Sequence, residues 1–242
     1  MFRISSILVF LTLFVACACS PPENNNDMGE DASTDGGGND LDPAEFGWLL
    51  HVQGRGAEDV YVVGGEPTSG RMKRFDGVAW QDEDLPAGTP LLNWIQLWDG
   101  VATVVGSGGT ILRNDGTGWV SETSPTEEDL WGVWGASADD VWAVGGRGRA
   151  EGQATILRRV GGVWTEVESP PLARPGVNAW YKVWGTSADN FYVVGQRGGV
   201  LHWTGSAFEE EGLGSSDDLI SLHGTGPENV VMFGGQYYSS AA

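Results

Sequence analysis

A phrase that recurs five times is the strongest constraint on the fold of this chain. Each copy has a short apolar run, a turn, a second apolar run and a closing Gly. The clearest copies read LWGVWGASADDVWAVGG from Leu130 and WYKVWGTSADNFYVVGQ from Trp180, and looser copies begin at Leu49, Trp94 and Leu219. Self-similarity of this kind is typical of β-propeller blades. The closing glycines follow one another at intervals of 42, 39, 50 and 39 residues: Gly64, Gly106, Gly145, Gly195 and Gly234.

The copy at residues 129–168 predicts how one blade is built. Two apolar runs, 130–134 and 141–144, precede a third centred on Ile156 and a fourth around Trp164. Gly-containing turns between the runs predict antiparallel hairpins, because glycine adopts the positive φ of tight turns at low cost. We therefore predict an all-β propeller of about four complete four-stranded blades and a partial fifth. The expected blades are residues 46–84, 91–124, 129–169 and 178–211, with the partial blade at 217–238.

The fifth copy supplies only two strands, so the predicted ring is incomplete. A propeller removes its exposed sheet edges by closing. Three alternatives follow: the chain is a fragment of a protein with further blades, the blades form an open arc, or a second chain closes the ring. We favour the fragment, because the break falls inside a repeat.

Residues 1–19 predict a signal peptide with a lipobox. A basic start at Arg3 precedes an apolar run over 7–16, and the small-residue stretch that follows ends with Cys17 and Cys19. This is the order of a secretory signal, and the run is shorter than the ~18–20 residues of a membrane-spanning helix. Residues 13–17 (LFVAC) resemble the lipobox of bacterial lipoproteins, although the usual Leu three positions before the Cys is absent. The resemblance implies lipidation of Cys17 or, in the alternative register, of Cys19.

Residues 20–45 predict a disordered acidic tether between the lipidated Cys and the propeller. The segment has no aromatic residue and too little apolar surface to offset the entropy of ordering it. The whole chain carries a formal net charge of −20, which argues against nucleic acid as a partner and against electrostatic adhesion to anionic lipid. We therefore expect attachment through the lipid, in the bacterial cell envelope at the outer membrane or cell surface. Secretion is the alternative.

The first strand of each blade lines the central channel of a propeller, so its side chains are the candidate binding residues. One face of these strands is apolar in every copy, and the other mixes large aromatic and polar side chains. Such a mixture suits a sugar or another small polar ligand. Packing of Trp between neighbouring blades is the competing interpretation, and it is the favoured one. The candidate channel-lining residues are His51, Gln53, Gln96, Trp98, Trp134, Lys182, Trp184 and His223.

Residues that recur once per blade indicate structural roles. Asp59, Asp139 and Asp189 recur, one per blade, at the turn before the second strand, where we expect them to cap backbone N–H groups. We predict no metal and no cofactor: both Cys precede the repeats, and no two of the three His lie at a metal-ligand spacing.

Two copies of the repeat, VWGASADDVWAVGG and VWGTSADNFYVVGQ, together with TILRNDGTGW and VLHWTGSAF, carry a family resemblance. They resemble the Trp/Gly-rich propeller repeats related to Asp-box (sialidase-type) proteins and photosystem-assembly propellers, which occur in bacterial extracytoplasmic lipoproteins. The resemblance covers about residues 46–238. The Asp-box itself, Ser-x-Asp-x-Gly-x-x-Trp, is not reproduced, and the arginine cluster and Tyr nucleophile of sialidases have no counterparts. The resemblance therefore implies a scaffold more than a hydrolase.

These features predict a lipid-anchored, extracytoplasmic propeller that is a non-catalytic scaffold for a protein or glycan partner. One alternative is a glycoside-active hydrolase or lyase. Its candidate acids are Glu66, Asp82 and Glu151, and it would need two carboxylates ~5–9.5 Å apart. Another alternative is a truncated fragment without a function of its own.

Overall fold

The computed structural model describes residues 41–147, 152–173 and 175–235. The predicted signal peptide with Cys17 and Cys19, most of the predicted tether, and Glu151 lie outside the described residues. Their predicted roles stay predictions.

Antiparallel β-sheets make up nearly all of the fold: four sheets of four strands and one of two. The short helix α1 (Pro43–Phe46) comes first. Blade 1 contains β1 (Trp48–Gly56), β2 (Asp59–Glu66), β3 (Ser69–Phe75) and β4 (Trp80–Asp82). Blade 2 contains β5 (Leu92–Trp98), β6 (Val101–Gly106), the 3₁₀ turn η1 (Ser107–Gly109), β7 (Ile111–Asn114) and β8 (Trp119–Ser121).

The next two blades repeat the order, and the last has two strands. Blade 3 contains β9 (Leu130–Ser137), β10 (Asp140–Gly145), β11 (Thr155–Val160) and β12 (Val163–Glu166). Blade 4 contains β13 (Trp180–Ser187), β14 (Asn190–Gly195), the 3₁₀ turn η2 (Gln196–Gly198), β15 (Val200–Trp203) and β16 (Phe208–Glu210). Blade 5 contains β17 (Asp218–Gly226) and β18 (Asn229–Gly235). The prediction of an all-β fold with four complete blades and a partial fifth is confirmed.

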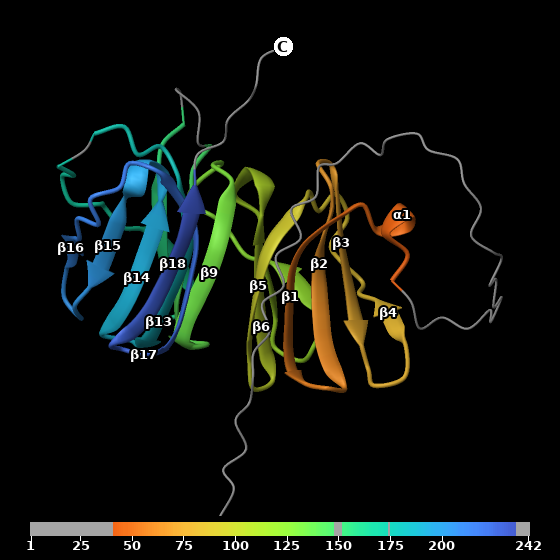
Figure 1. Cartoon of the computed structure of the whole chain (residues 1–242). Helices are drawn as coiled ribbons and strands as arrows, with labels where there is room; N and C mark the ends of the chain where they lie inside the picture. The colour runs from red at the N-terminus through yellow and green to blue at the C-terminus, as the bar shows by residue number, and fades with distance from the viewer. Residues whose placement is uncertain (1–40, 148–151, 174, 236–242) are drawn as a thin grey trace, which may run out of the picture.

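The blades stand side by side in an arc (Figure 1), and the first strand of each contacts the first strand of the next. In the described part of the chain the ring is not closed. Large apolar side chains are exposed at both ends of the arc, with Trp48 of β1 55% exposed and Phe233 of β18 54% exposed. The fragment, the open arc and closure by a second chain all stay open.

Apolar clusters fill the gaps between neighbouring blades. The cluster between blades 3 and 4 is the richest in aromatic rings, and Trp142 of β10 and Phe191 of β14 are fully buried there, with ring centroids 4.9 Å apart. Val63 of β2 and Ile95 of β5 belong to the corresponding cluster between blades 1 and 2. The alternating pattern of the strands therefore buries side chains on both faces, as the propeller arrangement requires.

The closing glycines of the repeat allow a close approach between strands. Each pairs with the start of its blade's first strand, beside an irregularity in register. A Cβ on Gly64, Gly106, Gly145, Gly195 or Gly234 would lie 1.7, 2.2, 2.0, 2.4 or 1.9 Å from the carbonyl oxygen of Trp48, Leu91, Asp129, Ala179 or Asp218, respectively. Any side chain would displace the first strand, so the spacing visible in the sequence is set by backbone contact.

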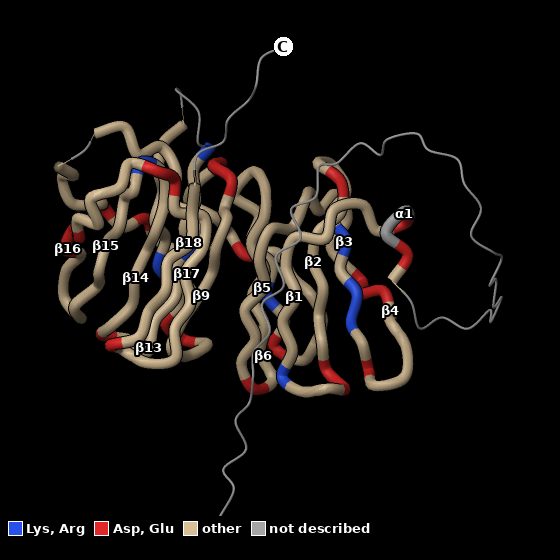
Figure 2. The backbone as a smooth tube through the Cα atoms, in the orientation of Figure 1, with Lys and Arg blue, Asp and Glu red and all other residues tan. Residues whose placement is uncertain are grey.

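Most charged residues occupy positions in the turns and at the edges of the blades (Figure 2). Among the described residues, no group of three or more His, Cys, Asp and Glu side chains is arranged to bind a metal ion. No helix in the described ranges has the length and apolarity to cross a bilayer.

Candidate functional site

The predicted channel-lining side chains of blade 1 reach the first strand of blade 2. Gln53 Oε1 accepts a 2.9 Å hydrogen bond from the backbone N–H of Leu97. His51 Nδ1 accepts a 3.3 Å bond from the N–H of Ile95. Both bonds use groups on β5, so these two side chains join the inner strands of neighbouring blades.

Three of the predicted tryptophans take part in similar contacts. Trp98 Nε1 donates a 3.0 Å hydrogen bond to the carbonyl of Gly135 in β9. Trp134 is buried between blades 3 and 4, and the ring centroid of Trp184 lies 5.3 Å from that of His223 in β17. Gln96 Nε2 donates to the neighbouring carbonyl of Leu97 at 3.1 Å. The three tryptophans thus contact the neighbouring blade, whereas Gln96 bonds within its own strand. The role of all four in lining a ligand channel stays a prediction.

His51, Trp94 and Lys182 come together from three different blades, and we call them the central stack. The rings of His51 and Trp94 are stacked, with centroids 3.4 Å apart. Lys182 Nζ lies 3.9 Å from the centroid of the Trp94 ring, which is within cation–π distance. Lys182 also donates a 2.6 Å hydrogen bond to the carbonyl of Trp131 in β9. All three side chains are half-buried, so the stack presents part of its surface to solvent.

The central stack holds a cation without an acidic partner. Among the described residues, no carboxylate oxygen lies within 4.0 Å of Lys182 Nζ, whereas Arg158 and Arg159 each pair with a carboxylate at 2.8 Å. Burial lowers the pKa of Lys182 from 10.5 to about 7. Burial, and then the nearby charge of Lys182, lower the pKa of His51 well below 6.5. A carboxylate brought to Lys182 would satisfy the charge, so the stack is suited to binding an anionic group.

The predicted turn-capping residues have varied surroundings. Asp59 accepts hydrogen bonds from Arg55 and from Arg74. Burial alone would raise the pKa of Asp59, but these two hydrogen bonds hold it below its usual value. Asp139 and Asp189 lie in the corresponding turns of blades 3 and 4, one position before Asp140 and Asn190, which take the place of Asp59 in the strand pairing. Capping of backbone N–H groups by Asp59, Asp139 and Asp189 stays a prediction.

Capping of backbone N–H groups is found at another turn, between the third and fourth strands. In blade 1, Asp76 Oδ1 accepts from the N–H groups of Val78 and Ala79, both at 2.9 Å. In blade 2, Asp115 Oδ1 accepts from the N–H of Thr117 at 3.2 Å. The Asp-Gly pairs at 76–77 and 115–116 are the sequence signal for these caps.

The structure places two of the three candidate acids in blade 1. Asp82 in β4 forms a 2.8 Å ion pair with Lys73, and its side chain is 78% exposed. Glu66 is the exposed last residue of β2. Glu151 lies outside the described residues.

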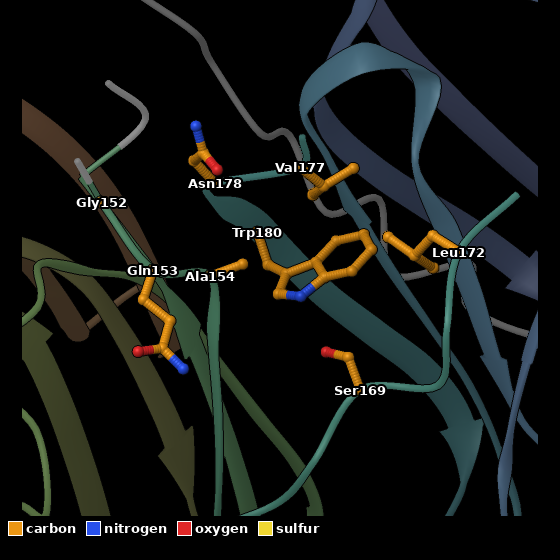
Figure 3. Close-up of a pocket in the computed structure, with 8 residues that line it drawn as sticks. All are labelled: Gly152, Gln153, Ala154, Ser169, Leu172, Val177, Asn178 and Trp180. Atoms are coloured by element: carbon orange, nitrogen blue, oxygen red, sulfur yellow. The ribbon is translucent and has the colours of Figure 1, made fainter. Parts of the chain in front are cut away.

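A cavity that sequence reasoning missed lies at the junction of blades 3 and 4 (Figure 3). It has a volume of about 240 Å³. Trp180, the first residue of β13, is one of the residues around it, and the indole nitrogen points toward Ser169 (Figure 3). The lining residues are Gly152, Gln153, Ala154, Ser169, Leu172, Val177, Asn178 and Trp180. The signal that could have revealed this cavity is a break in the repeat, because Trp180 pairs with its closing Gly where the other blades have Leu49, Leu92, Leu130 and Leu219.

Comparison with known proteins identifies the fold. No model of a known protein family matches the chain, and no curated protein matches it. A solved structure described as YCF48 bound to D1 peptide is 13% identical, with a TM-score of 0.58 over 81% of this chain and 65% of that one. The structure of YCF48 from Cyanidioschyzon merolae is 17% identical, with a TM-score of 0.54 over 76% of this chain and 63% of that one.

The chain thus spans less than two thirds of the length of these similar structures. At this level of identity the likeness concerns the fold alone, and it supports the propeller architecture. The photosystem-assembly part of the family resemblance stays a prediction. The Asp-box and lipoprotein parts of that resemblance stay predictions.

Proposed function

We propose that this chain is a non-catalytic propeller that binds an extended segment of a partner protein outside the cytoplasm. The observation that carries the proposal is the central stack, where Lys182 lies against Trp94 with no carboxylate within 4.0 Å among the described residues. A peptide carboxylate, from an acidic side chain or a chain end, is the group that complements it. One structure of the same fold is described as bound to a peptide, which supports peptide binding as a use of this architecture.

The surroundings of Lys182 favour selective binding over general adhesion. The chain as a whole is strongly acidic, so an anionic segment is repelled from most of its surface. The half-buried ammonium lies in a region of reduced dielectric constant, where pairing with a carboxylate is stronger than at an exposed site. We therefore expect binding to depend on one cation.

A peptide screen tests this function. A random peptide library displayed on phage is selected on the full chain and on Lys182→Met, which keeps the length of the side chain but removes its charge. We expect acidic peptides to be enriched on the natural chain and to bind Lys182→Met at least about tenfold more weakly, a typical loss for one charge-assisted hydrogen bond. Lys73→Met is the matched control, because Lys73 pairs with the exposed Asp82.

Three results would contradict the proposal. The first is equal binding of the enriched peptides to the natural chain and Lys182→Met. The second is enrichment of no peptide, together with specific hits on a glycan array. The third is turnover of a glycoside by the purified chain, which would favour the hydrolase alternative.

The proposal includes a lipid anchor at Cys17 or Cys19, supported by the lipobox-like residues 13–17. Growth with radiolabelled palmitate should label the natural chain in the membrane fraction. Cys17→Ser should abolish the labelling if Cys17 is the modified residue, and Cys19→Ser should do so in the alternative register. Full labelling of the double variant, or none of the natural chain, would contradict the anchor.

A further inference from the structure

We propose that the cavity between blades 3 and 4 receives one apolar side chain of a bound peptide, and that Trp180 Nε1 donates a hydrogen bond to the backbone carbonyl beside it. The inference rests on the proposed peptide-binding function and gives it a second point of contact. We call this cavity, which is lined by residues 152–154, 169, 172, 177, 178 and 180, the blade 3–4 pocket.

Trp180 supplies a buried donor at this pocket. Its side chain is 0% exposed, and its Nε1 has no hydrogen-bond partner among the described residues. Leaving a buried N–H unpaired costs about 1–3 kcal/mol. By contrast, Trp131 and Trp164 each donate at 2.7 Å or less to the carbonyl of Gly146 and the carboxylate of Glu122. A ligand that displaces the side chains covering this N–H and offers it an acceptor would recover the cost.

Trp180 also breaks the repeat in a way that packing alone does not require. The equivalent side chains Leu92 and Leu130 are fully buried, so Leu fills this position in the complete blades 2 and 3. An indole is larger and adds a polar atom that must be desolvated.

The connections beside the pocket are the longest of their kind among the blades. The segment between β10 and β11 spans 146–154, whereas the equivalents span 67–68, 107–110 and 196–199. The segment between β12 and β13 spans 167–179, and the other links between blades span 83–91, 122–129 and 211–217. In repeat proteins, insertions of this kind commonly mark the binding face. Here both insertions contribute lining residues to one pocket.

The size and lining of the pocket identify the class of ligand. A volume of about 240 Å³ is below the ~300–1,000 Å³ of pockets that hold whole drug-sized ligands, so it suits a single side chain. Ala154, Leu172 and Val177 provide apolar walls, and Trp180 provides the donor (Figure 3). An apolar side chain next to an amide carbonyl complements these groups, because the side chain fits the apolar walls and the carbonyl accepts from the donor.

The pocket and the central stack are joined by one strand. Trp180 and Lys182 are two residues apart on β13, with an irregularity in the strand pairing between them. The two groups therefore belong to one short stretch of chain, and we expect a segment with an apolar residue near an acidic one to contact both.

A one-residue peptide mimic tests the pocket directly. N-acetyl-leucine-N-methylamide is titrated into the ¹⁵N-labelled full chain while the indole N–H resonances are followed by NMR. Loss of one resonance in Trp180→Phe identifies the Trp180 signal. We expect that signal to move saturably with the mimic, and Trp180→Phe to bind about three- to tenfold more weakly, as measured on backbone amides.

Two further variants separate binding from folding. Ala154→Leu fills the pocket but keeps the indole, so its Trp180 signal should be present and should no longer respond to the mimic. Trp48→Phe changes an exposed tryptophan on blade 1 and should leave the affinity unchanged.

The inference is overturned if the Trp180 signal of the natural chain does not move, if Trp180→Phe binds with unchanged affinity, or if methyl β-glucoside moves the signal and the mimic does not. Loss of acidic-peptide binding in Lys182→Met with an unresponsive Trp180 signal would refute the pocket and leave the proposed function standing. A responsive Trp180 signal, with no effect of Lys182→Met on the binding of acidic peptides, would refute the proposed function and leave the pocket standing.

Discussion

Trp164 Nε1 in blade 3 donates a 2.6 Å hydrogen bond to Oε2 of Glu122, which follows the fourth strand of blade 2. Trp119 of blade 2 repeats this bond with Glu83 of blade 1 at 2.7 Å. Each acceptor stands three residues after the tryptophan of its own blade, as in the pair Trp80 and Glu83. Two Trp–Glu hydrogen bonds, which we call the Trp–Glu relay, therefore link the outer strands of blades 1 to 3. Blade 1 supplies an acceptor, blade 3 supplies a donor, and blade 2 supplies one of each.

The relay changes at the junction of blades 3 and 4. Phe208 of β16 stands where the other complete blades have Trp, and Val167 stands where blades 1 and 2 have Glu. Both pack into the aromatic cluster between these two blades. Donor and acceptor have thus been replaced together by apolar groups, which avoids leaving a buried carboxylate or N–H unpaired.

The first prediction concerns the two relay acceptors. Glu122 also pairs with Arg159 at 2.8 Å, and Arg159 is only 8% exposed. Glu122→Ala should therefore lower the free energy of unfolding by about 3–5 kcal/mol, because it leaves a buried guanidinium without its partner. Glu83→Ala should cost about 1 kcal/mol, since it removes one hydrogen bond. Urea denaturation of the two variants measures the difference, and equal losses would contradict this account.

The second prediction is that the relay can be rebuilt between blades 3 and 4. Val167→Glu alone should destabilise the chain, because it buries a carboxylate with no donor nearby. Adding Phe208→Trp should restore part of the stability, with a coupling free energy of about 1 kcal/mol in a double-mutant cycle. The four free energies of unfolding give this value, and additive effects would show that the two positions do not form the bond.

The third prediction concerns the closing glycines. In Gly145→Ala the new Cβ would lie 2.0 Å from the carbonyl oxygen of Asp129, so the first strand of blade 3 must shift. We expect a loss of at least about 2 kcal/mol in the free energy of unfolding, comparable to overpacking a core. Gly56→Ala at the end of β1 is the control, because no atom lies within 4 Å of its Cβ position. A loss at Gly145 no larger than that at Gly56 would contradict the close-approach explanation.

Much of the fold follows from the sequence, because the features that set it recur. The closing glycines and the apolar alternation appear once per repeat, so each copy of the repeat independently supports the same strand positions. The Asp-Gly pairs likewise place the hairpins between the third and fourth strands. Closure of the ring depends on contacts between blades that are distant in sequence, and no local pattern contains that information.

The candidate site could be predicted only in part, for a physical reason. The position of His51 and Lys182 on first strands predicts them as candidates, but their meeting around Trp94 depends on how three blades are oriented in space. The repeat places Trp180 on a strand, but its unpaired N–H follows only from the neighbours of the indole. Position within a repeat predicts which strand a side chain occupies, whereas its partners come from tertiary packing.

The last prediction is a pH dependence of stability that comes from Lys182. Burial lowers its pKa to about 7 in the folded chain, whereas an unfolded lysine has a pKa of 10.5. Between these two values the unfolded chain binds a proton that the folded chain does not, so the free energy of unfolding rises with pH. Well below pH 7 both states are protonated and the contribution is constant. We expect this half-buried lysine to add about 1–2 kcal/mol of stability between pH 7 and pH 9.

The comparison that isolates this effect is the natural chain against Lys182→Met, with urea denaturation at pH 6, 7, 8 and 9. The difference in free energy of unfolding should change little from pH 6 to 7 and then shift more steeply in favour of the natural chain as the pH rises. Lys73→Met should show no such trend, because Lys73 is paired with Asp82. A parallel pH dependence in Lys182→Met and the natural chain would mean that Lys182 keeps the pKa of an exposed lysine, and that the central stack does not hold a destabilised cation.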